Sequence, residues 1–345
     1  MDRLRIVLVG LGGFGSRWAE VVQRSPEATL AAVVDASAQA RAAAVERLGD
    51  VPALASIEEA IAAVQADAAL IVVPPALHEP VALAALAAGW HVRCEKPLAD
   101  DLAAAFRLVA AVERTGLTFM VSQNYRWMAH VATLRRHLQD GLIGELGAIR
   151  HTFNKAWDFG GWRATLPDVL LEDMTIHHAD LLRYVTGREC EQVYAQSFRP
   201  SWSWFEGHSA ASVLMRFGGD LYVNYSGSWV GTGPQTSWTG TIEIEGTDGL
   251  LVLKNDELTH YARGKPNGDQ PAGRVLPTLD VAREPQDESL ARFVAAVRDG
   301  TRPETDIRDN LQSFAIVCAA LASARSGQPV RLAELLDQTR AGAGD

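Results

Sequence analysis

The sequence has little cysteine, no long block of basic residues and no long apolar segment. Its three cysteines, Cys94, Cys190 and Cys318, are odd in number and lie far apart in a chain of 345 residues. This spacing excludes a disulfide-stapled secreted domain and offers no paired thiolates for a structural zinc site. We therefore expect reduced thiols, no bound metal and a location in the cytoplasm.

Charge and hydropathy exclude two kinds of partner. The 32 basic and 42 acidic residues give a net charge of −10, and neither sign forms long blocks. Nucleic acids are bound by a basic stripe that displaces counterions, and an anionic membrane repels an acidic chain. Apolar stretches such as 81–90 are interrupted before they reach the length of a membrane span, and the first residues do not resemble a signal peptide. We expect neither nucleic acid nor membrane as a partner.

What the sequence does contain is a glycine-rich turn between a strand pattern and a helix pattern. Residues 5–9 (RIVLV) are aliphatic and mostly β-branched, and glycines follow at positions 10, 12 and 15. Gly10 permits the tight turn, Gly12 lets the backbone approach a pyrophosphate, and Gly15 allows close packing of the helix. The start of the helix then offers unpaired N–H groups to the phosphates. The pattern predicts a dinucleotide-binding βαβ unit, with Gly13 and Phe14 also bordering the cofactor.

An acidic residue occurs where such a unit selects its cofactor. A second β-branched run, 29–34, ends at Asp35, twenty residues after Gly15. A carboxylate at this place accepts hydrogen bonds from the adenosine ribose and repels a 2′-phosphate, which favours NAD over NADP. Ser37 and Arg41 lie close by in the chain and leave NADP open. We include Ser37 among the cofactor-binding residues.

The alternation of strand and helix patterns continues to about residue 124. The runs 68–73, 91–94 and 118–122 predict buried parallel strands, and the Ala-rich segments 56–64, 78–88 and 100–115 predict the connecting helices. A complete doubly wound sheet has six strands with intervening helices, and these runs together with 5–9 and 29–34 account for five of them. We predict an α/β Rossmann-type dinucleotide-binding domain over residues 1–124, and the length of the chain favours a second domain.

The remaining residues, 125–345, follow a different pattern. Alternating stretches at 189–198, 208–217, 220–230, 238–246 and 249–254 predict strands of a largely antiparallel sheet, and two helices, about 286–299 and 308–326, close the chain. A polar loop covers 264–275. We predict an α+β domain with an open sheet that binds the substrate and forms a homodimer or homotetramer. Its C-terminal helix can pack back on the first domain.

Two groups of residues have side chains suited to proton transfer. Asp173 and His177 are four residues apart in a helical pattern, so one helix face presents both, and the carboxylate can orient the imidazole. A surface helix would explain the same two residues without any function. Lys96 follows the buried strand 91–94 at the C-terminal edge of the sheet, where open α/β sheets bind ligands. An ammonium fixed there stabilises the alkoxide of a substrate hydroxyl.

The order of these motifs resembles the glucose–fructose oxidoreductase / inositol dehydrogenase / rhizopine-catabolism (Gfo/Idh/MocA) family of NAD(P)-dependent oxidoreductases. Glu95-Lys96-Pro97 follows the fifth strand, SQNYRW spans 122–127, and LLEDMTIHHADLLRYVTG spans 170–187. The resemblance covers nearly the whole chain. It implies a cis Lys96–Pro97 bond and a carbohydrate or polyol as the substrate.

The resemblance also implies a role for each candidate residue. His177 takes the hydroxyl proton, Lys96 polarises the oxygen, and Asp173 orients His177 or binds a neighbouring hydroxyl, while the nicotinamide accepts the hydride. His78 either contacts the cofactor or caps a helix, and the sequence leaves both interpretations open. The further cofactor-binding residues that we predict are Pro74, His78, Glu95, Lys96, Asn124 and Arg126.

Tryptophan is concentrated in the second part of the chain, where seven of the nine lie at or beyond Trp127. Trp157 and Trp162 directly precede the Asp173 segment and are candidates for stacking on the apolar face of a sugar. Core or interface packing would explain both rings as well. Arg163 shares their loop and could bind hydroxyls or a carboxylate. Together with Lys96, Asp173 and His177, these residues form the predicted substrate site.

The sequence departs from the family pattern at three places. Pro167-Asp168-Val169 stands where many members have glycines, Thr175 replaces an inner glycine, and Pro75 replaces an asparagine. These changes leave the substrate open. We predict an NAD-dependent dehydrogenase that oxidises a secondary alcohol of a sugar, cyclitol or related polyol. The alternatives are an NAD-dependent glycosidase that oxidises its substrate transiently before elimination, and a non-catalytic NAD-binding sensor.

Overall fold

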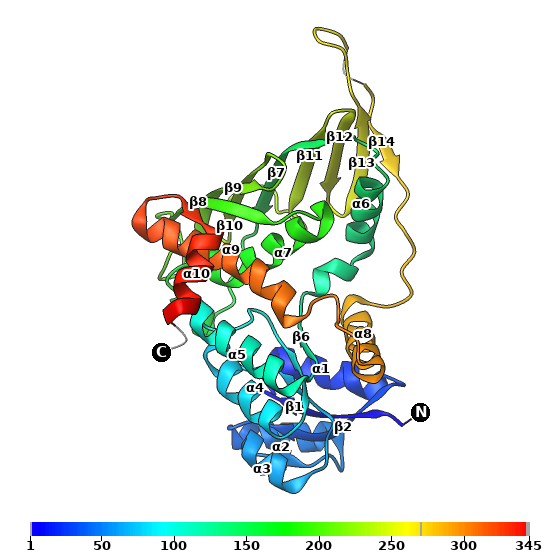
Figure 1. Ribbon diagram of the computed structural model, residues 1–345, viewed down its shortest axis with the longest axis vertical. Helices are drawn as coiled ribbons and strands as arrows, with labels where there is room; N and C mark the ends of the chain where they lie inside the picture. Colours follow the sequence, from blue (N-terminus) through cyan, green and yellow to red (C-terminus); the bar gives the residue numbers. More distant parts are fainter. Residues whose placement is uncertain (1, 270, 343–345) are drawn as a thin grey trace. The chain divides into compact units, whose positions relative to one another are not determined.

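A computed structural model describes residues 2–269 and 271–342, so the outer ends of both predicted domains and residue 270 of the predicted loop lie outside the described residues. The described chain forms two compact units, which Figure 1 shows as ribbons. The first contains residues 2–124, 283–311 and 339–342, and the second contains residues 125–269, 271–282 and 312–338.

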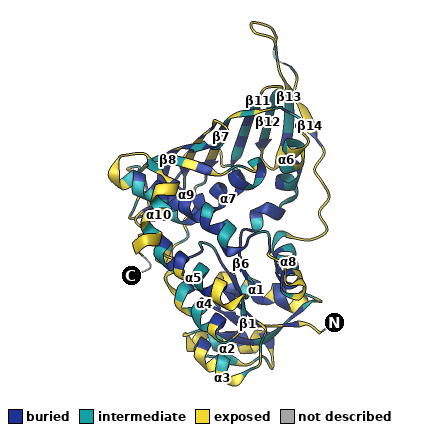
Figure 2. Ribbon diagram, in the orientation of Figure 1, coloured by how far each residue is buried: buried dark blue, intermediate teal, exposed yellow. Residues whose placement is uncertain are grey.

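The first unit is built on a six-stranded sheet in the order β3-β2-β1-β4-β5-β6, with every neighbouring pair parallel. Its strands are β1 (Leu4–Val9), β2 (Ala28–Val34), β3 (Ala53–Leu54), β4 (Ala68–Ile71), β5 (His91–Cys94) and β6 (Phe119–Val121). All residues of β4 and β6 are buried, as expected where helices cover both faces of a parallel sheet. Figure 2 shows this central layer in dark blue. The predicted doubly wound α/β fold is confirmed.

Helices connect these strands, and polar caps fix where several of them begin. Ser37, Ser56 and Asp101 each accept a hydrogen bond from a backbone N–H in the first turn of the following helix. Gly116, in the left-handed conformation with φ 68°, ends the longest of them. The helices are α1 (Gly13–Arg24), α2 (Ala38–Leu48), α3 (Ile57–Ala63), α4 (His78–Ala87) and α5 (Leu102–Thr115), with a short 3₁₀ turn, η1 (Pro75–Leu77), before α4.

A later segment completes the first unit. Helix α8 (Pro285–Asp299) packs against α1, where the guanidinium of Arg24 donates to Asp287 at 2.7 Å. The hydroxyl of Thr305 donates to the carbonyl of Val121 in β6 at 2.7 Å. The sequence assigned residues 283–311 to the second domain, because a helical pattern does not state which sheet the helix covers.

The second unit contains a nine-stranded sheet in the order β14-β13-β12-β11-β7-β10-β9-β8-β15. The β7–β10 pair is parallel and every other pair is antiparallel, so the predicted, largely antiparallel sheet is confirmed. Five strands match predicted stretches: β8 (Cys190–Phe198), β9 (Ala210–Phe217), β10 (Leu221–Ser228), β11 (Thr241–Gly246) and β12 (Gly249–Lys254). Four were not predicted: β7 (Leu146–Asn154), β13 (Glu257–Ala262), β14 (Arg274–Leu276) and β15 (Val330–Arg331).

Helices lie along one face of this sheet, as Figure 1 shows for α6 and α7. In β10 the side chains of Leu221, Val223 and Tyr225 are buried, while the intervening residues are exposed. This alternation gives the sheet one covered face. The helices of the unit are α6 (Ala129–Gln139), α7 (Thr175–Thr186) and α9 (Ile307–Ser326). The first turn of α9 belongs to the first unit. A third C-terminal helix, α10 (Leu332–Gly342), follows the two that were predicted.

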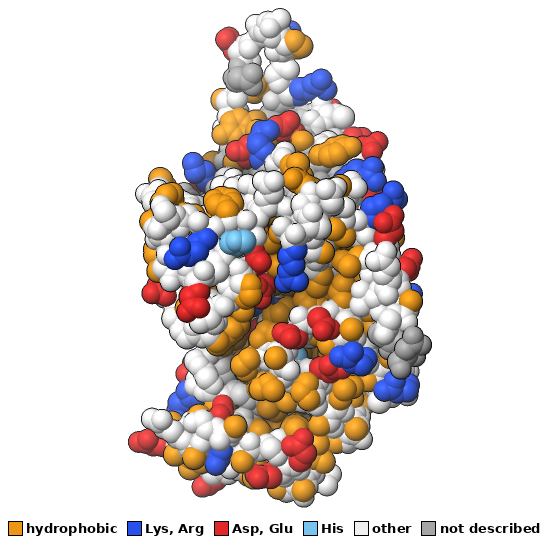
Figure 3. All heavy atoms as spheres, turned by 90° about the vertical axis from the view of Figure 1, so that its left-hand side faces the viewer, with side chains coloured by type: hydrophobic (Ala, Val, Ile, Leu, Met, Phe, Trp, Pro, Cys, Tyr) orange, Lys and Arg blue, Asp and Glu red, His pale blue; other side chains and the backbone are white. Residues whose placement is uncertain are grey.

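Charged side chains of both signs lie on the surface. On the face drawn in Figure 3, basic and acidic side chains of the described residues are interspersed. In the part of the chain that the structure describes, no helix combines the length and apolar character needed to cross a bilayer.

Candidate active site

The glycine-rich turn leaves an open space in front of helix α1. A Cβ atom at Gly10, where φ is 97°, would lie 2.3 Å from the carbonyl oxygen of Val72, and one at Gly15 would lie 2.0 Å from the carbonyl oxygen of Gly10. At Gly12 and Gly13 an added Cβ would meet no atom within 4 Å. Two glycines are therefore required by close packing, and two keep the helix N-terminus accessible. This geometry fits a pyrophosphate on the first N–H groups of α1.

Asp35 is fixed beside this turn by backbone donors. Its Oδ2 accepts a hydrogen bond from the N–H of Leu11 and its Oδ1 accepts one from the N–H of Ser37, both at 2.8 Å. The guanidinium of Arg41 donates to the backbone carbonyl of Asp35 at 2.7 Å, and the hydroxyl of Ser37 caps α2. The carboxylate is thus oriented before any ligand binds. Each of its oxygens has one further lone pair for a ribose hydroxyl.

The turn after β5 carries Glu95, Lys96 and Pro97. The Lys96–Pro97 bond is cis, as the resemblance implied. Glu95 is buried, and its two carboxylate oxygens accept hydrogen bonds from the indole N–H of Trp18 at 2.9 Å and from the backbone N–H of Lys96 at 3.3 Å. These bonds make Glu95 a support for the turn that presents Lys96.

His78, another predicted cofactor-binding residue, contacts the same turn through its imidazole ring. Its side chain is fully buried at the start of α4, with Nδ1 2.8 Å from the carbonyl oxygen of Pro97 and Nε2 2.9 Å from that of Val73. Burial lowers the pKa of His78, and both ring nitrogens face protein carbonyls. The ring therefore joins the end of β4 to the Lys96–Pro97 turn, and it has no nitrogen left for a ligand.

Arg93 is a buried cation directly beneath this turn, and sequence analysis did not select it. Its guanidinium lies 3.8 Å from the centroid of the Trp18 ring and donates to the hydroxyls of Ser122 at 3.0 Å and Ser289 at 2.6 Å. Burial lowers its pKa to about 10, against the raising effect of Glu95. The only sequence signal for a special role of Arg93 is a charged residue within a buried strand pattern. We infer that the Trp18–Arg93 stack supports Glu95 and so the position of Lys96.

In the second unit the stretch with the helical pattern has two parts: Asp173 lies in a π-helical turn, and His177 lies in α7. The turn, η4 (Leu170–Met174), leads directly into α7. The backbone N–H of Thr175 bonds to the carbonyl of Leu170, and its hydroxyl donates to the same oxygen at 3.0 Å. Such turns are rare and occur frequently at functional sites. Thr175, which replaces a family glycine, thus closes the wide turn that carries Asp173.

Asp173 and Arg163 form a partly buried ion pair. The Nε of Arg163 lies 3.1 Å from Oδ1 of Asp173, and the Asp173 side chain is only 9% exposed. The guanidinium also lies over the ring of Trp162, 4.4 Å from its centroid. The structure therefore brings together three predicted substrate residues, Trp162, Arg163 and Asp173.

His177 lies in the first turn of α7 and packs flat against Tyr125. The two ring centroids are 4.4 Å apart with an interplanar angle of 11°. Burial raises the pKa of the Tyr125 phenol, and the neighbouring Asp173 raises it further. Tyr125 is therefore neutral, and its ring fixes the plane of the His177 imidazole by stacking. The sequence alone did not identify Tyr125 as a site residue, although it lies between Asn124 and Arg126 in the SQNYRW motif.

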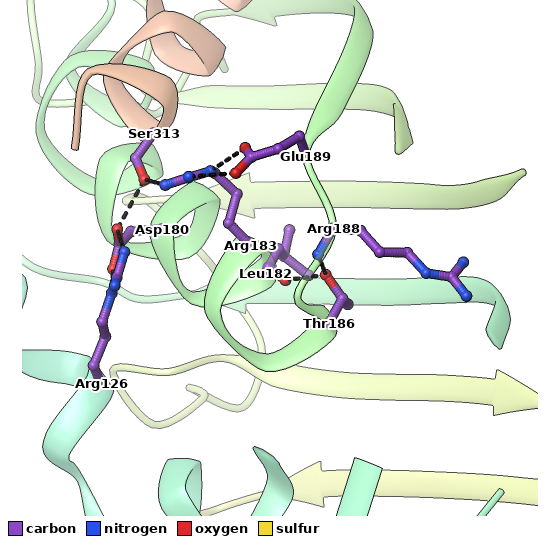
Figure 4. Close-up of polar contacts among 8 residues, drawn as sticks. All are labelled: Arg126, Asp180, Leu182, Arg183, Thr186, Arg188, Glu189 and Ser313. Atoms are coloured by element: carbon purple, nitrogen blue, oxygen red, sulfur yellow. Dashed lines mark hydrogen bonds and ion pairs between the residues drawn. The ribbon is translucent and has the colours of Figure 1, made fainter. Parts of the chain in front are cut away.

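Arg126, a predicted cofactor-binding residue, forms a buried ion pair in the second unit. Its guanidinium donates to both carboxylate oxygens of Asp180 in α7, at 2.7 and 2.6 Å, and the two side chains are 5% and 2% exposed. Figure 4 shows how the network continues. The hydroxyl of Ser313 in α9 donates to Asp180 at 2.8 Å and accepts from Arg183 at 2.7 Å, and Arg183 pairs with Glu189. The network fixes α7, and with it His177.

The remaining predicted residues have these positions. Pro74 precedes η1, and Pro75, which replaces a family asparagine, begins it. Gly13 begins α1, and Phe14 beside it is exposed. Asn124 begins the 3₁₀ turn η2 (Asn124–Trp127). Lys96 and the cofactor residues up to Asn124 belong to the first unit, whereas Asp173, His177, Trp157, Trp162 and Arg163 belong to the second. No group of three or more potential metal ligands occurs among the residues that the structure describes.

The doubly wound sheet, the glycine turn and Asp35 together define a dinucleotide-binding oxidoreductase domain. Residues 4–123 match the oxidoreductase family with an NAD-binding Rossmann fold, and residues 131–252 match the GFO/IDH/MocA C-terminal domain. The chain belongs to the Gfo/Idh/MocA family of oxidoreductases, and its first unit is an NAD-binding Rossmann domain.

Individual relatives agree with this family. The chain is 30% identical to the uncharacterized protein y4oX of Sinorhizobium fredii, over 98% of both chains. It is 29% identical to the D-apiose dehydrogenase of Paraburkholderia graminis, over 97% of this chain and 91% of that one. An Agrobacterium radiobacter oxidoreductase, solved with NAD+, L-tartaric acid and magnesium, has the same fold, with a TM-score of 0.87 at 22% identity over 97% of this chain and 100% of that one.

Proposed function

We propose that the protein is an NAD-dependent dehydrogenase that oxidises a secondary alcohol of a sugar, cyclitol or related polyol. The observation that carries the proposal is the fixed position of His177. Its imidazole is stacked on Tyr125, and its helix is held by the buried Arg126–Asp180 ion pair, in a chain whose relatives include sugar dehydrogenases. When NAD is bound, its nicotinamide accepts the hydride from the alcohol carbon.

The chain's own residues handle the oxygen and its proton. We propose that the hydroxyl proton goes to Nε2 or Nδ1 of His177 and from there to solvent, while the C–H hydrogen leaves with its electron pair and a C=O bond forms. The Lys96 ammonium stabilises the negative charge that develops on the oxygen. Asp173, braced by Arg163, binds a neighbouring hydroxyl or orients His177. Trp157, Trp162 and Arg163 complete the proposed substrate site.

The cofactor site is proposed to include Gly10, Gly12, Gly13, Phe14, Gly15, Asp35, Ser37, Pro74 and Asn124, with Glu95 as the support of Lys96. We propose NAD over NADP because the Asp35 carboxylate is held beside the glycine turn by two backbone N–H groups. We further propose a homodimer or homotetramer that forms through the uncovered face of the second sheet, where Leu214 and Tyr222 are exposed. The buried thiols of Cys94 and Cys190 support a cytoplasmic location.

Asp35→Ala tests the cofactor assignment. We expect NAD affinity to fall by about 1.5–3 kcal/mol, because the ribose loses hydrogen bonds to a charged acceptor. Calorimetric titration with NAD and NADP measures the change, and Asp50→Ala, at an exposed position away from the turn, is the matched control. Unchanged NAD affinity in Asp35→Ala, together with tighter binding of NADP to the original protein, would show that the choice of NAD is wrong.

The most direct test of the function is a panel of sugars, inositols and glycosides, followed for NADH formation and for glycoside cleavage. We expect NADH to accumulate in proportion to the ketone formed. Release of a free sugar without net NADH would favour the glycosidase alternative, and NAD binding without turnover of any substrate would favour the sensor. Neither alternative is favoured by the relatives described above.

A further inference from the structure

Four aromatic side chains of the second unit form a continuous array from its core to its surface. The array consists of Trp229, Phe159, Trp238 and Trp157. Trp229 is completely buried, and its ring centroid lies 4.8 Å from Phe159 and 6.0 Å from Trp238. Trp157 lies 5.8 Å from Trp238 and 6.5 Å from Phe159, and it is 48% exposed. Trp157, the outermost ring, therefore packs against Phe159 and Trp238, which both contact the buried ring of Trp229.

The backbone that carries Trp157 is also held in place. The N–H of Lys155 donates to the carbonyl of Ser228 at 2.9 Å, and the N–H of Trp157 donates to the carbonyl of Trp229 at 3.2 Å. Ala156 forms an isolated antiparallel bridge with Val230. A large ring that is exposed and yet immobilised is typical of a binding surface, because little conformational entropy is lost when a ligand covers it.

The array is connected to the proposed catalytic centre through Arg163. The guanidinium of Arg163 lies 5.5 Å from the centroid of Phe159, and its Nε lies 3.1 Å from Oδ1 of Asp173. Phe159 and Arg163 thus link Trp157 to Asp173 through successive side-chain contacts. A ligand that reaches both ends of this chain of contacts needs one group for each end.

Lys155 indicates the chemistry of that second group. Its ammonium lies 5.0 Å from the centroid of the Trp238 ring, and it forms no ion pair among the described residues. Covering the Lys155 ammonium with the apolar surface of another protein would remove its water and cost free energy. A ligand with hydroxyl groups can instead accept hydrogen bonds from it. A sugar ring presents an apolar C–H face that stacks on an indole and equatorial hydroxyls that reach such a donor.

We propose that the array is a second sugar subsite, so that the substrate is a glycoside: one ring is oxidised beside Asp173 and His177, and the next ring stacks on Trp157. The proposal rests on the proposed dehydrogenase function. It distinguishes a disaccharide or larger glycoside from a free monosaccharide or an inositol, neither of which has a second ring to reach Trp157.

Trp157→Ala tests the subsite with defined probes, a free hexose and disaccharides built from the same hexose. We expect the KM for the preferred disaccharide to rise about tenfold more than the KM for the free hexose, because only the disaccharide loses a second ring stacked on the indole. Trp204→Ala, which removes another exposed tryptophan that packs on Phe205, is the matched control and leaves all constants unchanged. Equal effects on hexose and disaccharide, or none, would overturn the proposal.

Binding without turnover separates the subsite from the proposed reaction. Disaccharide affinity is measured by calorimetry on both variants, and NADH formation is measured separately. Weaker disaccharide binding in Trp157→Ala supports the subsite even if no substrate yields NADH, in which case the dehydrogenase function alone fails. NADH formation from the free hexose with no disaccharide binding overturns the subsite alone. A change of oligomeric state in Trp157→Ala with unchanged sugar binding also overturns it, because the array is then a contact between copies.

Discussion

Lys96→Ala and His177→Ala are each expected to lower turnover by at least about a hundredfold while NAD binding stays nearly intact. Lys96 loses the charge that stabilises the developing alkoxide, and His177 loses the group that accepts its proton. Turnover follows from NADH formation with the best substrate of the panel, and NAD affinity from titration of the same preparations. The expected loss in kcat/KM is larger than that in NAD affinity, because the affected groups act on the substrate.

Matched variants distinguish a loss of chemistry from a loss of structure. Lys254→Ala and His260→Ala remove the same side-chain types from positions in β12 and β13 that we do not assign to the site. His177→Asn keeps a planar side chain against Tyr125, where His177→Ala leaves a gap, so the two variants share low activity but differ in stability. Turnover near that of the original protein in a Lys96 or His177 variant would remove that residue from the mechanism.

Asp180→Ala is expected to lower the free energy of unfolding by about 3–5 kcal/mol, because it leaves the Arg126 guanidinium buried without its carboxylate. The Arg126 and Asp180 side chains are 5% and 2% exposed, so water cannot replace the lost partner. Urea unfolding of the two proteins measures the difference.

An exposed ion pair provides the control for this prediction. Arg136 and Asp140 are 65% and 50% exposed, so Asp140→Ala is expected to change stability by at most about 1 kcal/mol. A second variant, with Arg126→Met and Asp180→Leu together, removes both charges and is expected to recover much of the loss. A loss in Asp180→Ala no larger than that in Asp140→Ala would show that the buried pair does not stabilise the second unit.

The sequence predicts best those features whose signal is local. Gly15 is required by a contact with the backbone of Gly10, and Asp35 is fixed by N–H groups of the adjoining turn. The sequence does not predict β7, whose buried face carries His151 between Ile149 and Phe153. A polar residue in the apolar register obscured a strand that lies in the middle of the sheet.

By itself the sequence determined the class of the protein: a doubly wound dinucleotide-binding domain, a second α+β domain and the candidate residues Lys96, Asp173 and His177. Strand periodicity, the backbone freedom of glycine and the order of motifs are properties of neighbouring residues, so the chain alone reveals them. The tertiary structure decided the use of each side chain. It turned Arg126 toward Asp180 and His78 toward Pro97, and it placed Tyr125 on His177. Those partners are separated by up to 54 residues along the chain, and burial selects them because a buried polar group requires a partner that no local pattern specifies.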